Sequence, residues 1–189
     1  MQENNTVENE NGFKPRENRQ GGYNKNRQSG SYRRGPKPDM ERTMYYITLL
    51  CPPEIDEPIA AHKDMMKETF GCEVAAKSPA HLTLVAPFFL SDGKYRELLE
   101  RLEAFESIVS EIHVDVNGYG QFHERVIFAD VQVTDNLNAM QEQLETYLRN
   151  GGFPFIKEAK KPFHPHITIA TRDLKEADFA AAWANFEGK

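Results

Sequence analysis

The segment HLTL at residues 81–84 recurs as HITI at residues 166–169, so histidine, aliphatic, threonine and aliphatic residues follow in the same order twice. Side chains of a β-strand point alternately to its two faces, so each histidine shares a face with its threonine. The aliphatic residues lie on the opposite face, where a core would cover them. The pattern therefore predicts two strands that are buried on one side and carry chemically active side chains on the other.

The two segments occupy equivalent places in a repeated order of strand, helix, motif strand and helix. In the first half we expect these elements at residues 45–51, 54–70, 80–88 and from Ser91 or Asp92 onward. In the second half we expect them at residues 126–133, from Asp135 onward, at 165–171 and around 179–186. The periodicities and the glycines that end the first and third helices support these ranges. The repeat predicts an α+β protein with two pseudo-symmetric lobes, one for each half.

The first half also contains a predicted strand at residues 112–116, followed by a turn at Tyr119-Gly120. The second half has no counterpart to this strand before Lys189. We therefore expect the second lobe to lack its last strand.

Residues 1–43 differ in composition from residues 44–189. They carry nine Lys and Arg against six Asp and Glu with almost no aliphatic residues, whereas residues 44–189 carry fourteen against twenty-three. A segment so poor in apolar residues cannot offset its ordering entropy by burial. We expect residues 1–43 to form a disordered basic tail rich in Arg, Gly and Asn, and residues 44–189 to form one domain.

Residues 13–38 of the tail hold eight basic residues and one acidic residue, interspersed with Gly, Tyr, Asn and Gln. This composition is similar to that of Arg- and Gly-rich segments that contact RNA loosely. The alternative is a solvated tail without a partner.

The sequence contains no apolar run in residues 1–43 and no stretch long enough to cross a bilayer. Cys51 and Cys72 do not have the spacing of a metal or redox pair, so we expect two buried, reduced thiols. These features predict a cytoplasmic protein without a membrane partner, and we expect it to be a monomer.

The histidines and threonines of the two motifs suit chemistry at a phosphodiester. Histidine titrates near pH 6.5, so at neutral pH one imidazole can accept a proton while another donates one. Each role contributes about 10²–10⁴-fold in rate. We therefore predict His81 and His166 as catalytic residues, and Thr83 and Thr168 as donors to the phosphoryl oxygens. Arg172 follows the second motif strand closely and is a further candidate for phosphate binding.

The remaining histidines have weaker claims to a role. His113 begins a similar segment, but Asp115 replaces the threonine and would repel a phosphate, so we expect a solvent-facing position. His164 and His166 could bind a metal together, but no third ligand has suitable spacing. We therefore predict neither a metal nor a cofactor. His62 and His123 are assigned no role.

The paired motifs resemble the HxTx motifs of the 2H phosphoesterase superfamily, and are most similar to its branch of 2′-5′ RNA ligases and RNA 2′,3′-cyclic phosphodiesterases. The stretches YYITLLCPPEI, GYGQFHERVIFADV and PHITIATR are also similar, and the resemblance covers residues 44–186. It implies a bilobal fold with antiparallel sheets around a central cleft. It also implies that His81 and His166 form an acid–base pair and that Thr83 and Thr168 hold the phosphate.

The resemblance implies hydrolysis of 2′,3′-cyclic phosphates at RNA ends, and in some members reversible 2′-5′ ligation. Two alternatives stay open at this point. The protein could be a non-catalytic RNA-binding protein that uses the cleft and the Arg-rich tail, or a phosphodiesterase for small cyclic nucleotides. The sequence does not show which histidine is the acid and which is the base.

Overall fold

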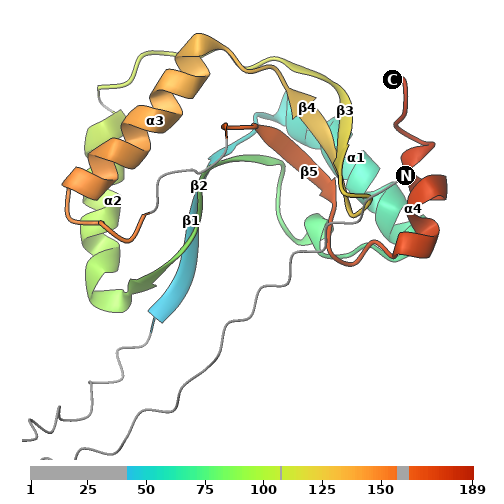
Figure 1. Cartoon of the computed structure of the whole chain (residues 1–189), viewed down its shortest axis with the longest axis horizontal. Coiled ribbons are helices and arrows are strands. Elements are labelled where there is room, and N and C mark those ends of the chain that lie inside the picture. The colour runs from blue at the N-terminus through green and yellow to red at the C-terminus, as the bar shows by residue number, and fades with distance from the viewer. Residues whose placement is uncertain (1–41, 107, 157–161) are drawn as a thin grey trace, which may run out of the picture. The chain divides into compact units, whose positions relative to one another are not determined.

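The computed structural model describes residues 42–106, 108–156 and 162–189, all within the compact unit Met40–Lys189. It confirms an α+β fold with antiparallel sheets (Figure 1). Strand β1 (Arg42–Leu50) pairs with β2 (His81–Ser91), and β3 (Val116–Phe122), β4 (Val126–Val131) and β5 (His166–Ala170) form a second sheet in the order β3-β4-β5. Residues 1–41 of the tail predicted at residues 1–43 lie outside the described residues, whereas its last two residues, Arg42 and Thr43, belong to β1.

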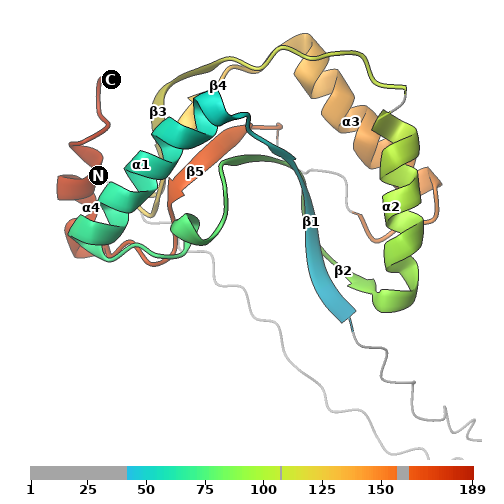
Figure 2. The same cartoon turned by 180° about the vertical axis from the view of Figure 1, so that it is seen from behind.

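Helices cover the two sheets in separate pairs. Their bounds are Pro53–Phe70 for α1, Asp92–Glu106 for α2, Asp135–Asn150 for α3 and Glu176–Trp183 for α4, with a short 3₁₀ turn η1 at Ala75–Lys77. Helices α2 and α3 pack together beside β2, whereas α1 contacts β5 and α4 (Figures 1 and 2). The ranges predicted from periodicity agree with these helices within a few residues.

The expectation that each half of the sequence forms its own lobe is wrong. Helix α1 follows β1 in the chain but packs against β5 in the second sheet, while α3 follows β4 but packs against β2 in the first. Periodicity shows which face of a helix is apolar, but not which sheet will cover that face. Each half therefore contributes to both sheets.

The strand predicted at residues 112–116 is also wrong. Only Val116 belongs to a strand, and β3 pairs with β4 in the second sheet. The half-buried Ile112 and Val114 instead line an apolar cavity of about 470 Å³ beside β1. Their apolar spacing reflects packing without strand pairing. The second lobe was expected to lack a strand only by comparison with a strand at residues 112–116, and residues 112–115 form none. The second sheet has the three strands β3, β4 and β5.

The turn predicted at Tyr119-Gly120 lies four residues further on. Tyr119 and Gly120 are within β3, and the chain reverses at His123 and Glu124, which have φ angles of 51° and 54°. Gly120 is required for a different reason: a Cβ there would lie 2.5 Å from the ring of Phe128. The glycine thus allows close approach of an aromatic ring rather than a turn.

The helix boundaries follow capping rules. Helix α1 ends at Gly71, whose φ of 72° is left-handed, as the sequence predicted. Helix α3 begins at Asp135, as expected, and is capped by Thr134, which has extended backbone angles and whose Oγ1 accepts a hydrogen bond of 3.1 Å from the Leu137 amide.

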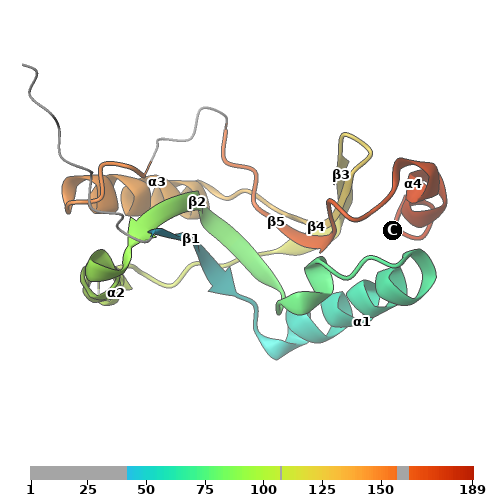
Figure 3. The same ribbon diagram turned by 90° about the horizontal axis from the view of Figure 1, so that it is seen from below.

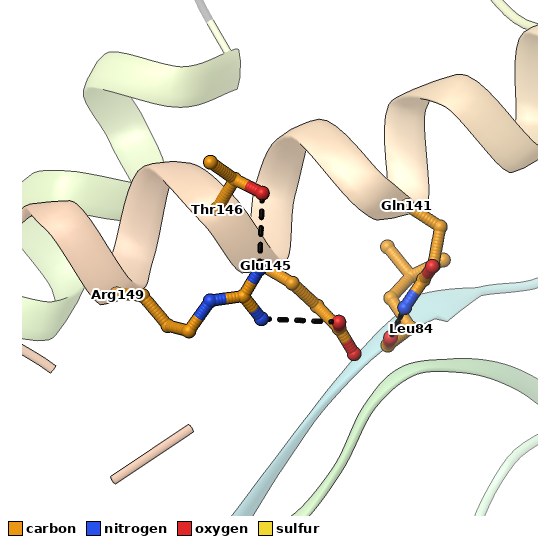
Figure 4. Close-up of polar contacts among 5 residues, drawn as sticks. All are labelled: Leu84, Gln141, Glu145, Thr146 and Arg149. Atoms are coloured by element: carbon orange, nitrogen blue, oxygen red, sulfur yellow. Dashed lines mark hydrogen bonds and ion pairs between the residues drawn. The ribbon is translucent and has the colours of Figure 1, made fainter. Parts of the chain in front are cut away.

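A buried glutamine fixes α3 to β2 near the first motif (Figure 4). Strand pairing passes from Thr48–Thr83 to Ile47–Val85 and skips Leu84. The Gln141 side chain, only 3% exposed, donates a hydrogen bond of 3.0 Å to the Leu84 carbonyl. The irregular pairing therefore leaves no unsatisfied carbonyl at this point.

The sequence also led us to expect two buried, reduced thiols and no membrane-spanning segment. Cys72 is buried as expected, but the expectation is wrong for Cys51, which is only half-buried, and both thiols are free. Burial raises the pKa of Cys72 to about 11, so this thiol stays protonated at neutral pH. Within the described residues, no helix has the length and apolarity needed to cross a membrane.

Candidate active site

Each motif histidine is the first residue of its strand, His81 in β2 and His166 in β5. The two strands belong to different sheets but contact each other (Figure 3). The predicted alternation is confirmed: the histidines and threonines are half-buried, and the four aliphatic residues are buried, namely Leu82, Leu84, Ile167 and Ile169. The fold thus brings both motifs together, each with its polar face open.

The two imidazoles make the same local hydrogen bond. The His81 Nδ1 lies 2.9 Å from the Pro79 carbonyl oxygen, and the His166 Nδ1 lies 2.9 Å from the His164 carbonyl oxygen. A carbonyl oxygen can only accept, so Nδ1 carries a hydrogen whether the ring is neutral or charged. Nε2 is then the atom that gains or loses a proton on each ring.

The two rings have different surroundings. The centroids of the Phe122 and Phe128 rings each lie 5.1 Å from that of His166. Burial lowers the pKa of His166, and the positive charges of His164 and His81 lower it further, against the opposing effects of the His164 carbonyl and Asp130. The neutral form of His166 is therefore favoured.

Helix α1 holds the loop that precedes β2. Asp56 Oδ1 accepts a hydrogen bond of 2.6 Å from the Ala80 amide, and Lys63 Nζ donates one of 2.9 Å to the Ser78 carbonyl. These two contacts flank the carbonyl that orients the His81 ring. Lys63 is only 4% exposed, and its burial lowers its pKa while the nearby Asp56 carboxylate raises it. The helix thus fixes the backbone on both sides of the anchoring carbonyl.

Each threonine lies two residues after its histidine in the same strand. Thr83 pairs with Thr48 across the first sheet, and Thr168 pairs with Phe128 across the second. Both are half-buried on the face of their histidine. Arg172 is exposed, just beyond the end of β5, and its contact with phosphate stays a prediction.

The other histidines lie outside this constellation. His164 Nε2 is 3.4 Å from Asp130 Oδ1, and the two side chains are 54% and 38% exposed. His113 is exposed, as expected, and His62 makes a hydrogen bond of 2.8 Å with the Tyr119 hydroxyl. In the part of the chain that the structure describes, no three His, Cys, Asp or Glu residues are grouped to hold a metal ion.

The sequence reasoning missed three residues near His81. Asp56 and Lys63 are two helical turns apart, a spacing that places them on one face of a predicted helix and could have indicated a shared role. Tyr46, whose ring centroid is 5.9 Å from that of His81, had no such signal. It comes from a neighbouring strand whose register the sequence does not show.

These observations define the class: an α+β protein in which two antiparallel sheets bring one HxTx strand each to a common site. Residues 51–188 match the 2′-5′ RNA ligase superfamily, and the chain belongs to this family. The resemblance inferred from the motifs is thereby confirmed.

Two curated relatives agree with this assignment. An RNA 2′,3′-cyclic phosphodiesterase of Thermotoga maritima is 31% identical over 109 residues, which cover 56% of each chain. A protein of Geobacillus sp. (strain WCH70) named as a phosphoesterase is 30% identical over 104 residues, covering 54% of this chain and 56% of the relative. The chain therefore spans about half the length of the curated relatives it matches.

A solved structure supports the fold. The crystal structure of a Thermus thermophilus protein aligns with a TM-score of 0.54 at 22% identity, over 71% of this chain and 76% of that protein.

Proposed function

We propose that the chain is a metal-independent phosphodiesterase that opens 2′,3′-cyclic phosphates at RNA ends. The observation that carries the proposal is that two contacting strands each begin with a histidine whose Nδ1 is held by the carbonyl two residues earlier, which leaves Nε2 to transfer a proton. Family membership supports phosphodiester chemistry. The name of the Thermotoga maritima relative supports a cyclic phosphate as substrate.

The different surroundings of the two rings support an assignment of roles. His166 is the general base, because its neutral form is favoured. Its Nε2 takes a proton from water while the water oxygen forms a bond to phosphorus. His81 is the general acid, and its protonated Nε2 donates to the ribose oxygen as the bond from that oxygen to phosphorus breaks. The product is a phosphate monoester beside a free ribose hydroxyl.

The hydroxyls of Thr83 and Thr168 donate hydrogen bonds to the two non-bridging oxygens in this mechanism. Negative charge grows on these oxygens as water adds, so fixed donors stabilise the transition state more than the substrate. Arg172 adds a positive charge at the edge of the site. If the 5′-hydroxyl of a second RNA replaces water, the same proton transfers give a 2′-5′ linkage, which the family name makes a second candidate reaction.

The test uses the full chain with EDTA and two substrates, a 2′,3′-cyclic mononucleotide and an oligoribonucleotide ending in a cyclic phosphate. We expect turnover to a monoester by the wild type, and a loss of about 10²–10⁴-fold in kcat in both His81→Ala and His166→Ala. His113→Ala is a matched control, because His113 is an exposed histidine outside the site. Full activity in either His81→Ala or His166→Ala would contradict the mechanism. Loss of wild-type activity in EDTA would contradict metal independence.

The same assay separates the alternatives. RNA binding without turnover, lost when residues 1–41 are deleted, would indicate a non-catalytic RNA-binding protein. A 2′-5′ linked product formed from an added 5′-hydroxyl RNA would demonstrate ligation.

A further inference from the structure

The exposed face of β1 and β2 that carries His81 continues far beyond the catalytic pair. Opposed residues of antiparallel strands lie on the same face. Leu50 is opposite His81, Thr48 is opposite Thr83, and further along the sheet Met44 is opposite Phe89. Between these positions Tyr46 shares the face, as its ring contact with His81 shows.

Large apolar side chains on this face are unusually open. Tyr46 is 48% exposed, Met44 56% and Phe89 60%, whereas Phe88 and Leu90 on the opposite face are buried. We call Tyr46, Met44 and Phe89 the stacking face. Contiguous exposed apolar side chains of this size commonly mark a binding surface. The stacking face lies on the same side of the sheet as Thr83 and His81. It therefore lies beside the position proposed for the reacting phosphate.

The chemistry of the face favours the bases of single-stranded RNA over other occupants. Aromatic side chains on an open sheet stack on unpaired bases, and such stacking does not depend on charge. This matters because residues 44–189 carry a net negative charge that disfavours binding of a phosphate backbone through charge alone. Positive charge occurs at the far end of the face, where Arg42 begins β1 opposite Ser91. The basic segment 13–38 precedes Arg42 closely in the sequence.

We propose that the stacking face binds the bases that precede the cyclic phosphate in an RNA strand, and that Arg42 contacts their backbone. The inference rests on the proposed function and narrows its substrate to RNA of more than one nucleotide. Tyr46, whose ring is 5.9 Å from His81, stacks on a base near the reacting end. Met44 and Phe89 lie about 7 Å further along the sheet and stack on the next base. The strand then runs toward Arg42.

The test compares a 2′,3′-cyclic mononucleotide with a tetranucleotide ending in a 2′,3′-cyclic phosphate. In Phe89→Ala and Tyr46→Ala, we expect kcat/KM for the tetranucleotide relative to the mononucleotide to fall about 5- to 150-fold, through KM. Tyr46→Phe retains the ring and should retain the ratio. Leu99→Ala removes a comparably exposed apolar side chain from α2 and should leave the ratio unchanged.

Fluorescence anisotropy with a labelled tetranucleotide 3′-phosphate gives a readout that does not need turnover. Weaker binding by Phe89→Ala than by Leu99→Ala supports the stacking face even if the proposed function fails. An equal ratio and equal binding in Phe89→Ala and the wild type overturn the inference. So does sedimentation showing a wild-type dimer that Phe89→Ala dissociates, because a second copy would then cover this face.

Discussion

At the residue scale, the two catalytic candidates combine a shared local geometry with different surroundings. The Nδ1 of His81 and of His166 each meets the carbonyl two residues earlier, so the local chain orients both rings in the same way. The sequence predicted these residues and their faces, because alternation along a strand is a local property. It could not predict the Phe122 and Phe128 rings around His166, because they reach it by pairing of distant strands.

The lowered pKa of His166 predicts how stability depends on pH. The unfolded chain binds a proton at His166 near pH 6.5, while the folded protein does so only at lower pH, so the free energy of unfolding falls as pH drops below about 6.5. Above that pH neither state is protonated there and this contribution vanishes. We expect the unfolding free energy of His166→Gln, measured by urea denaturation, to depend less on pH than that of the wild type. The comparison covers about pH 5 to 7, the range in which histidines titrate.

Part of the pH dependence of stability should remain in His166→Gln, because burial also lowers the pKa of His62.

The lowered pKa of His166 also predicts the pH profile of catalysis. The acid limb of kcat/KM for the wild type, which reports the general base in the free enzyme, should lie below pH 6.5. An acid limb above about pH 7 would contradict the assignment of His166 as the base.

At the element scale, α1 positions His81 through the backbone. Lys63→Met keeps the aliphatic length but removes the hydrogen bond to the Ser78 carbonyl, so the loop before β2 loses one of its two anchors. We expect kcat to fall about 10- to 100-fold with a smaller change in KM, because the His81 ring is displaced rather than the substrate contacts removed. Steady-state kinetics measure the split between kcat and KM.

Lys67→Met is the matched control, because Lys67 is exposed on the same helix. If Lys63→Met lowers thermal stability but leaves kcat unchanged, α1 has a purely structural role.

The contact between α3 and β2 gives a prediction for stability. Gln141→Leu leaves the Leu84 carbonyl buried without its donor, which costs about 1–3 kcal/mol of unfolding free energy. Urea denaturation measures the change, and Gln143→Leu, at an exposed position of α3, should change it little. Equal effects of the two substitutions would show that the hydrogen bond is not what matters.

Helices and strands differed in how well the sequence predicted them. The amphipathic period placed α1 and α3 well, because that signal is contained within each helix. The alternation at residues 112–116 indicated burial correctly but pairing wrongly. Packing under β1 and pairing with a neighbour produce the same local pattern, and only the tertiary fold distinguishes them.

At the scale of the domain, the crossing of the two halves connects the two candidate catalytic residues. Helix α1 packs against β5, which carries His166, and also holds the loop before His81 through Asp56 and Lys63. One helix therefore relates both histidines, although they come from different sheets. If each half formed its own lobe, as the repeated sequence suggested, some other contact would be needed to fix the positions of the two imidazoles relative to each other.

A cyclic phosphate whose leaving oxygen is replaced with sulfur separates the roles of the two histidines. A thiolate leaves without a proton, so the general acid becomes dispensable while the general base does not. We expect the sulfur substrate to restore most of the turnover of His81→Ala but not that of His166→Ala. Rescue of His166→Ala instead, or of neither variant, would contradict the assignment of acid and base to these two residues.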